Sequence, residues 1–144
     1  MGIFHVDIKI SSPGAKAKSF PVQRLMVDSG SEVTWVPAKT LKAAGVTVRK
    51  KDQLFIMANG QTITRDVGYA VLRCGDFETV DEVVFAREGD CKLLGARTLE
   101  GFNAHVDPVK KRLVAAGPMP AASAPLWSAD KRALKNWPRI NRNL

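Results

Sequence analysis

The sequence is poor in the residues on which metal and disulfide chemistry depends. Of its 144 residues only two are cysteine and two are histidine, and Cys74 and Cys91 stand apart without a CxxC spacing. A metal site is therefore not expected. Free thiols in a reducing compartment are the favoured state of the two cysteines, although the sequence leaves a disulfide between them open. His5 and His105 have no partner at a useful spacing and are interpreted as ordinary residues.

Long apolar runs are also missing. No run approaches the roughly 18 residues of a membrane span, and the start MGIFHVDIKI lacks the basic and apolar regions of a signal peptide. We therefore expect a cytoplasmic protein that has no membrane partner.

Acidic residues are in the minority, with 14 against 22 basic residues, so the formal net charge is +8. From Ala115 onward there are five basic residues and one acidic residue, so half of this excess lies in the tail. Tryptophan among basic residues can stack on bases and neutralise phosphate, which makes the tail a possible nucleic-acid contact. No nucleic-acid motif accompanies it, and basic charge usually marks a solvated surface, so a nucleic-acid partner is not expected.

Strand signals dominate the first 114 residues. Apolar and β-branched runs recur at spacings of about 8 to 12 residues and are separated by Gly, Pro and polar turn residues. The expected strands are 3–10, 20–27, 33–36, both halves of 54–64, 67–73, 77–86, a short buried one near 92–94, and a hairpin over 103–114. Short helices are expected over 37–45 and after Gly95. This pattern predicts an all-β barrel or sandwich.

The chain divides into three segments by composition. Residues 1–114 are expected to form one domain, which at this size can bury roughly two-thirds of its unfolded surface. Residues 115–125 are a small-residue, proline-bearing linker, and 126–144 are a basic tail with two tryptophans.

One carboxylate stands out within the stretch LMVDSGSEVTWVP, which covers residues 25–37. Asp28 follows the apolar run RLMV, so it ends a strand that is expected to be central. The ordinary interpretation is a turn in which the carboxylate accepts bonds from nearby amides. An isolated charge at the end of a central strand is costly to desolvate, however, which favours a functional role.

Four motifs follow one another along the chain: Asp28-Ser29-Gly30-Ser31, Trp35-Val36-Pro37, a hairpin at Asn59-Gly60, and Leu93-Leu94-Gly95. This ordered set resembles the aspartic proteases of the retropepsin and pepsin group. The resemblance covers roughly residues 3–114, and the closest look-alikes are small bacterial and archaeal single-domain members related to retroviral proteases. Ser29 stands where the family more often has threonine. This resemblance implies a closed, pepsin-lobe or retropepsin-like β-barrel with one lobe per chain.

The resemblance also implies a homodimeric aspartic endopeptidase. Such enzymes use two carboxylates that share a proton, whereas Asp-Ser-Gly occurs only once in this chain. Two copies must therefore pair about a twofold axis, so that the two Asp28 carboxylates activate a water for attack on a peptide bond. The expected substrate is a peptide or protein, and no cofactor or metal is implied.

Other motif residues receive supporting roles from the resemblance. Ser29 would bond across the twofold axis, the Gly30 amide would donate to the carboxylates, and the Ser31 hydroxyl would donate to the outer oxygen of Asp28. A bond to the charged carboxylate predicts a more acidic working range than alanine at position 31 would give.

The remaining motifs would cover and support the site. Residues Ala58, Asn59, Gly60 and Gln61 would form a substrate-binding flap. The hairpin is expected to reverse through a type I′ turn at Asn59-Gly60, and the alternative to a flap is an ordinary surface hairpin. Leu93, Leu94 and Gly95 would form a structural element behind the active-site loop, while Trp35 is expected in the core or cleft wall.

Two questions stay open at this point. Both chain ends are candidate dimer contacts, through Ile3–Ile10 and through Leu126, Trp127 and Trp137, but a solvated tail is the favoured interpretation. The same fold could also act as a catalytically idle dimer that binds peptides.

Overall fold

The computed structural model describes residues 3–14 and 16–119 of the chain. Strands dominate, which confirms the all-β class, and the two helices are short. The elements in chain order are β1 (His5–Ser11), β2 (Phe20–Val27), β3 (Thr34–Pro37), α1 (Ala38–Ala43), β4 (Val48–Ile56), β5 (Thr62–Cys74), β6 (Phe77–Ala86), β7 (Leu93–Leu94), α2 (Ala96–Gly101), β8 (Ala104–Asp107) and β9 (Arg112–Ala115).

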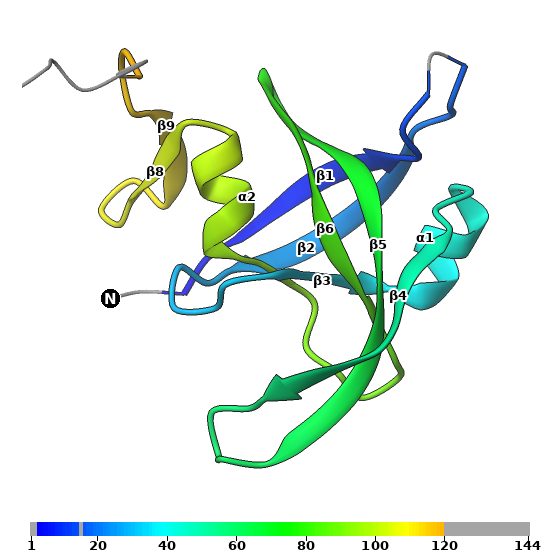
Figure 1. Cartoon of the computed structure of the whole chain (residues 1–144). Helices are drawn as coiled ribbons and strands as arrows, with labels where there is room; N and C mark the ends of the chain where they lie inside the picture. Colours follow the sequence, from blue (N-terminus) through cyan, green and yellow to red (C-terminus); the bar gives the residue numbers. More distant parts are fainter. Residues whose placement is uncertain (1–2, 15, 120–144) are drawn as a thin grey trace, which may run out of the picture.

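Six strands form a closed ring. The hydrogen-bonded order is β1-β2-β7-β3-β6-β5, and β5 pairs back with β1 through Lys9–Ser11 and Val71–Arg73. β4 is added to the outside edge of β5, and the β4–β5 hairpin projects from the ring at the bottom of Figure 1. β8 and β9 form a separate two-stranded sheet beside α2.

Two apolar clusters fill this framework. The larger one lies inside the ring and includes the fully buried Leu25, Leu41 and Leu94. A smaller one is centred on Trp35 and receives the half-buried Phe55 from the projecting hairpin. Each fully buried aliphatic or aromatic side chain of this kind contributes about 1.5–3 kcal/mol to stability.

The expected elements are largely confirmed, but β4 and β5 are longer than the sequence predicts. β4 begins at Val48, and β5 runs without interruption from Thr62 to Cys74 across the break expected near residue 65. Most β4 side chains are exposed because this strand is paired with β5 alone. Its charged first half therefore lacks the apolar alternation by which strands are found in a sequence.

The expected type I′ turn at the hairpin tip is wrong. Only Gly60, with φ of 84°, takes a positive φ there, and Asn59 does not. The Gly60 amide donates to the Met57 carbonyl (2.8 Å), and the Met57 amide donates to Gln61 (2.8 Å). These bonds define a three-residue loop, in which a type I turn is followed by a left-handed glycine, the second common hairpin solution.

Several predictions concern parts of the chain that the structure leaves undescribed. The tail 126–144, with Leu126, Trp127 and Trp137, lies outside the described residues, as does the linker from residue 120. The boundary after residue 114 stays a prediction, next to the end of β9 at Ala115. Among the described residues, no helix has the length and apolar character needed to cross a membrane.

Candidate active site

Asp28 is the first residue after β2 and lies where three strands meet. β7 pairs in parallel with the end of β2, with Val27 opposite Leu94, and is flanked on its other side by β3. The Asp28 amide donates to the Leu94 carbonyl at 3.0 Å. The position of Asp28 is therefore fixed by a strand that arrives from more than 60 residues along the chain.

The carboxylate of Asp28 is held by its own loop. Its Oδ1 accepts a hydrogen bond from the Gly30 amide (3.0 Å), and its Oδ2 accepts one from the Ser31 hydroxyl (2.9 Å). Asp28 is half-buried, whereas Ser29 and Gly30 are exposed. Among the described residues no cation forms an ion pair with Asp28, so the half-buried carboxylate has no counter-charge there.

The backbone behind Asp28 packs very closely. A Cβ added to Gly95 would lie 2.5 Å from the Val33 carbonyl oxygen and 2.8 Å from that of Glu32, so only glycine fits there. Just beyond it, the Ala96 amide donates to the Ser31 carbonyl (2.7 Å), and the Arg97 amide donates to the Glu32 carbonyl (3.0 Å). The loop of residues 28–33 between β2 and β3, called the Asp28 loop below, is thus tied to the start of α2.

A buried chain of hydroxyl groups continues from Gly95. The Gly95 amide donates to Thr34 Oγ1 (2.9 Å), the two threonine hydroxyls of Thr34 and Thr98 are 2.6 Å apart, and Thr98 donates to Asp81 (2.8 Å). The Thr98 hydroxyl has one proton and donates it to the Asp81 carboxylate, so in the bond between the two threonines Thr34 is the donor and Thr98 the acceptor. Both threonines are fully buried.

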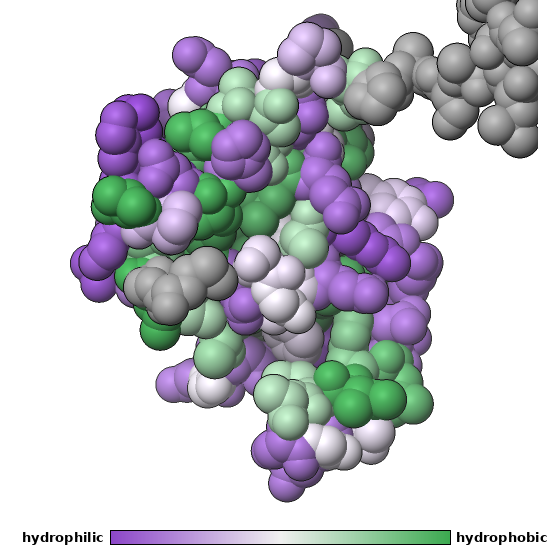
Figure 2. All heavy atoms as spheres, turned by 90° about the vertical axis from the view of Figure 1, so that its left-hand side faces the viewer, coloured by the Kyte–Doolittle hydropathy of each residue, from purple (hydrophilic) through white to green (hydrophobic). Residues whose placement is uncertain are grey.

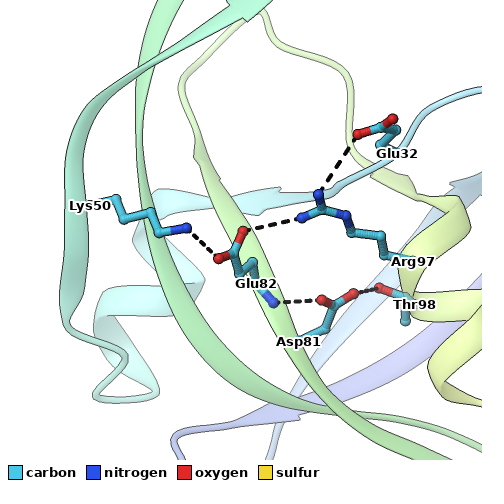
Figure 3. Close-up of polar contacts among 6 residues, drawn as sticks. All are labelled: Glu32, Lys50, Asp81, Glu82, Arg97 and Thr98. Atoms are coloured by element: carbon cyan, nitrogen blue, oxygen red, sulfur yellow. Dashed lines mark hydrogen bonds and ion pairs between the residues drawn. The ribbon is translucent and has the colours of Figure 1, made fainter.

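The sequence did not reveal this chain of hydrogen-bonded hydroxyl groups. Its only signal was a threonine inside each of two apolar stretches, and nothing in the sequence shows that Thr34 and Thr98 meet. Figure 3 shows that Asp81 also accepts a bond from the Glu82 amide (2.7 Å), so the carboxylate that ends the chain is itself fixed. These hydrogen bonds hold β3, β6 and α2 together behind the Asp28 loop, next to the end of β7.

Charged side chains form a second connection next to this one. Arg97 lies between Glu32 (3.9 Å) and Glu82 (3.3 Å), and Glu82 also pairs with Lys50 of β4 (Figure 3). The hydrogen bond and charge of Glu82 raise the pKa of Lys50. Because all four side chains are at least partly exposed, solvent screens these pairs and they contribute little to stability.

An apolar hollow of about 450 Å³ lies beside Asp28. Its lining combines the end of β2 and the Asp28 loop with Ile3 and Phe4 and one residue of β8. The lining residues are Ile3, Phe4, Met26, Val27, Asp28, Ser29, Gly30 and Val106. Figure 2 views the side of the molecule on which the β2–β3 loop lies, and apolar side chains gather there on the body and at the end of the projecting hairpin.

The hairpin tip does not line this hollow. Ala58, Asn59, Gly60 and Gln61 are all exposed at the end of the β4–β5 hairpin, where the Gln61 amide donates to the Asn59 side chain (3.0 Å). Further down the hairpin, the Phe55 ring contacts Trp35 with the ring centres 5.3 Å apart. Within one chain, therefore, the hairpin is anchored through its stem, while its tip is exposed.

Comparison with known proteins identifies the family. Residues 15–98 match a family model described as aspartyl protease. The chain belongs to the aspartyl protease family. The matched segment runs from before Asp28 to Thr98, and it therefore includes the loop, the hairpin, Gly95 and both buried threonines. The retropepsin-like resemblance drawn from the motifs is thereby confirmed, and the family indicates a protease. No curated protein matches the chain.

Proposed function

We propose that the protein is a homodimeric aspartic endopeptidase in which each chain supplies one Asp28. The observation that carries this proposal is the environment of the carboxylate: both oxygens are held by the Gly30 amide and the Ser31 hydroxyl, and the adjoining loop residues are exposed. A carboxylate that served only to close its turn would not need a second strand and a helix to fix it from behind.

A single chain provides half of the chemistry. Water activation in this family needs a second carboxylate within hydrogen-bond reach of the first. Among the described residues, no other acidic side chain bonds to Asp28, and Asp-Ser-Gly occurs once in the sequence. A twofold axis beside the loop would bring a second Asp28 to the first and make the site symmetric.

The surface around the loop supports such pairing. Ser29 and Gly30 are exposed, and the apolar hollow beside them is bordered by Ile3, which is 67% exposed. A second chain at this face would cover apolar surface and bring Ser29 of each chain close to the axis. The predicted contact through residues 3–10 fits this arrangement, and the contribution of the tail stays a prediction.

The mechanism follows from the two carboxylates. One Asp28, ionised, takes a proton from the water as its oxygen attacks the peptide carbonyl, while the other, protonated, donates to the carbonyl oxygen. The Gly30 and Ser31 bonds hold each carboxylate in the orientation that the water requires. The β4–β5 hairpin would close over an extended peptide and offer its backbone groups to it.

Peptide cleavage by matched variants tests the proposal. Wild type, Asp28→Asn and the control Asp76→Asn, an exposed turn residue, are incubated with a mixed peptide library from roughly pH 3 to 7. We expect cleavage by wild type and by the control, none by Asp28→Asn, and a rate that rises faster than linearly with enzyme concentration.

Mixing of variants separates a dimer from a monomer. If each site needs two Asp28 residues, an excess of Asp28→Asn chains should inhibit wild type by forming mixed dimers, while Asp76→Asn chains should not. Cleavage linear in concentration and unaffected by mixing would refute the shared site. Peptide binding without any cleavage would favour the idle binding module.

Cytoplasmic localisation is likewise a proposal. It is supported by Cys74 and Cys91, which are both free in the structure, because unpaired thiols are typical of a reducing compartment.

A further inference from the structure

The β4–β5 hairpin leaves the ring at a defined point. β5 pairs with β6 only from Val67 onward, so residues 53–56 and 62–66 form a two-stranded arm, next to which no third strand lies in the described part of the chain. An isolated two-stranded hairpin is at best marginally stable in water. Something other than strand pairing must therefore set the angle of this arm relative to the body.

Arg65 lies where the arm begins and bonds to the body. Its Nε donates to Asp90 Oδ2 (2.7 Å) and its Nη2 to Asp90 Oδ1 (2.8 Å), which is the two-pronged geometry that guanidinium and carboxylate groups favour. Both side chains are only 14% exposed. Among the described residues, this is the one ion pair that joins the arm to the rest of the molecule.

Asp90 is a rigid partner. It lies in the loop from β6 to β7, where its Oδ2 also accepts the Arg87 amide (2.8 Å) and its own amide donates to the Arg87 carbonyl (3.0 Å). The hydrogen bonds between Arg65 and Asp90 lower the pKa of Asp90 and raise the pKa of Arg65. Three residues further on, the same segment enters β7, the strand that fixes Asp28.

The opposite strand is bent at the same level. In β4 the register shifts between Lys50 and Gln53, and Asp52 takes a φ of 54°. The Asp52 amide donates to the Asp66 carboxylate (3.0 Å). Because Gln53 is paired with Arg65, the bulge of one strand and the ion pair of the other lie at one height and form the base of the arm.

We propose that Arg65 is a positioning residue that, through Asp90, sets the arm over the Asp28 loop and thereby the affinity for the peptide substrate. The substrate part of this inference rests on the proposed protease function. Neighbouring contacts agree with this proposal. Ile63 lies on the same face of β5 as Arg65 and, like Phe55, packs against the Trp35 cluster. The Arg65–Asp90 ion pair therefore holds an arm whose inner face is already in apolar contact with the body.

The test compares Arg65→Met with the matched control Arg73→Met. Arg73 lies on the same strand and pairs with Glu78, but both of these side chains are at least half exposed. Amide hydrogen exchange of residues 53–65 reports on the arm without requiring catalysis. We expect roughly tenfold faster exchange in Arg65→Met, which corresponds to about 1.4 kcal/mol, and no change in the control.

Kinetics supply the second readout. In Arg65→Met we expect KM to rise about tenfold with kcat within about twofold of wild type, because substrate binding is weakened while the dyad is intact. Arg65→Lys keeps the charge but not the two-pronged geometry, so its KM should lie between those of wild type and Arg65→Met. If Arg65→Met fails to fold, Asp90→Asn carries the test, since its amide oxygen can still accept the Arg87 amide.

The outcomes are distinct. Arm exchange unchanged from wild type would overturn the inference, and so would faster exchange with an unchanged KM. If wild type cleaves no peptide, the substrate part fails together with the proposed function, while the exchange experiment still decides whether Arg65 holds the arm.

Discussion

Alanine at position 95 should destabilise the protein because its Cβ would occupy the space into which the Asp28 loop packs. Its Cβ would meet the Val33 carbonyl oxygen at 2.5 Å, the Val33 carbonyl carbon at 2.6 Å and the Glu32 carbonyl oxygen at 2.8 Å. All three contacts are backbone atoms, which cannot turn away as a side chain can. The loop and the start of α2 must therefore move apart.

The size of the effect follows from these contacts. Overpacking a tight interior costs about 1–3 kcal/mol. The separation also strains the hydrogen bonds that the Ala96 and Arg97 amides make to the loop, each worth about 1 kcal/mol. We expect the free energy of unfolding to fall by roughly 2–4 kcal/mol, and Tm by roughly 6–16 °C for a chain of this size.

Denaturant unfolding and hydrogen exchange measure this. The control is Gly75→Ala: Gly75 has a φ of 59° but open space around it, so alanine there costs only backbone strain of roughly 1 kcal/mol. Gly95→Ala should also speed exchange of the Ala96 and Arg97 amides, which Gly75→Ala should leave unchanged. A Gly95→Ala protein that unfolds at the wild-type denaturant concentration, with these amides protected, would refute the reasoning.

Three further changes test other parts of the structure. Thr98→Val removes the hydroxyl between Thr34 and Asp81, and should lower the free energy of unfolding by about 1–3 kcal/mol, with most of it recovered by Thr98→Ser; an unchanged stability would contradict the buried chain. Asp90→Asn should destabilise by a similar amount at neutral pH. Because the pKa of Asp90 is lowered in the folded state, the ionised carboxylate contributes this stability at pH values above its usual pKa of about 3.9, and the contribution is lost as the pH falls through the lower folded-state pKa. The free energies of unfolding of wild type and Asp90→Asn should therefore converge in acid. A difference in stability that stays constant with pH would contradict the ion pair. A thiol reagent should label exposed Cys91 before Cys74, whose pKa is raised by burial and by the charge of Asp7; equal rates in the folded protein would contradict this.

Local patterns allowed much of the fold to be predicted. Strand β1, for example, alternates apolar and polar residues, and β6 is bounded by turn signals, so each could be located within a few residues. The stretch from Asp28 to Ser31 was identified because an acid, small residues and a glycine follow an apolar strand. In both cases the signal lies within one short segment, where backbone preferences and burial act together.

Strand β4 and the hairpin tip show where such signals end. Charged side chains on β4 are tolerated because only one neighbour pairs with it, and that is a property of the sheet. The turn at Gly60 depends on the register in which β4 meets β5, which Asn-Gly alone does not specify.

The sequence by itself located most of the strands and the loop that carries Asp28, and it predicted a second chain, because each depends on residues that are neighbours along the chain or on how often a motif occurs. Only the tertiary structure decided that Thr34 meets Thr98, 64 residues away, and that Arg65 meets Asp90, 25 residues away. Such pairs form because ring closure brings distant strands together and buries polar groups that must then find partners. A single threonine or arginine in a sequence carries no record of which partner it will have.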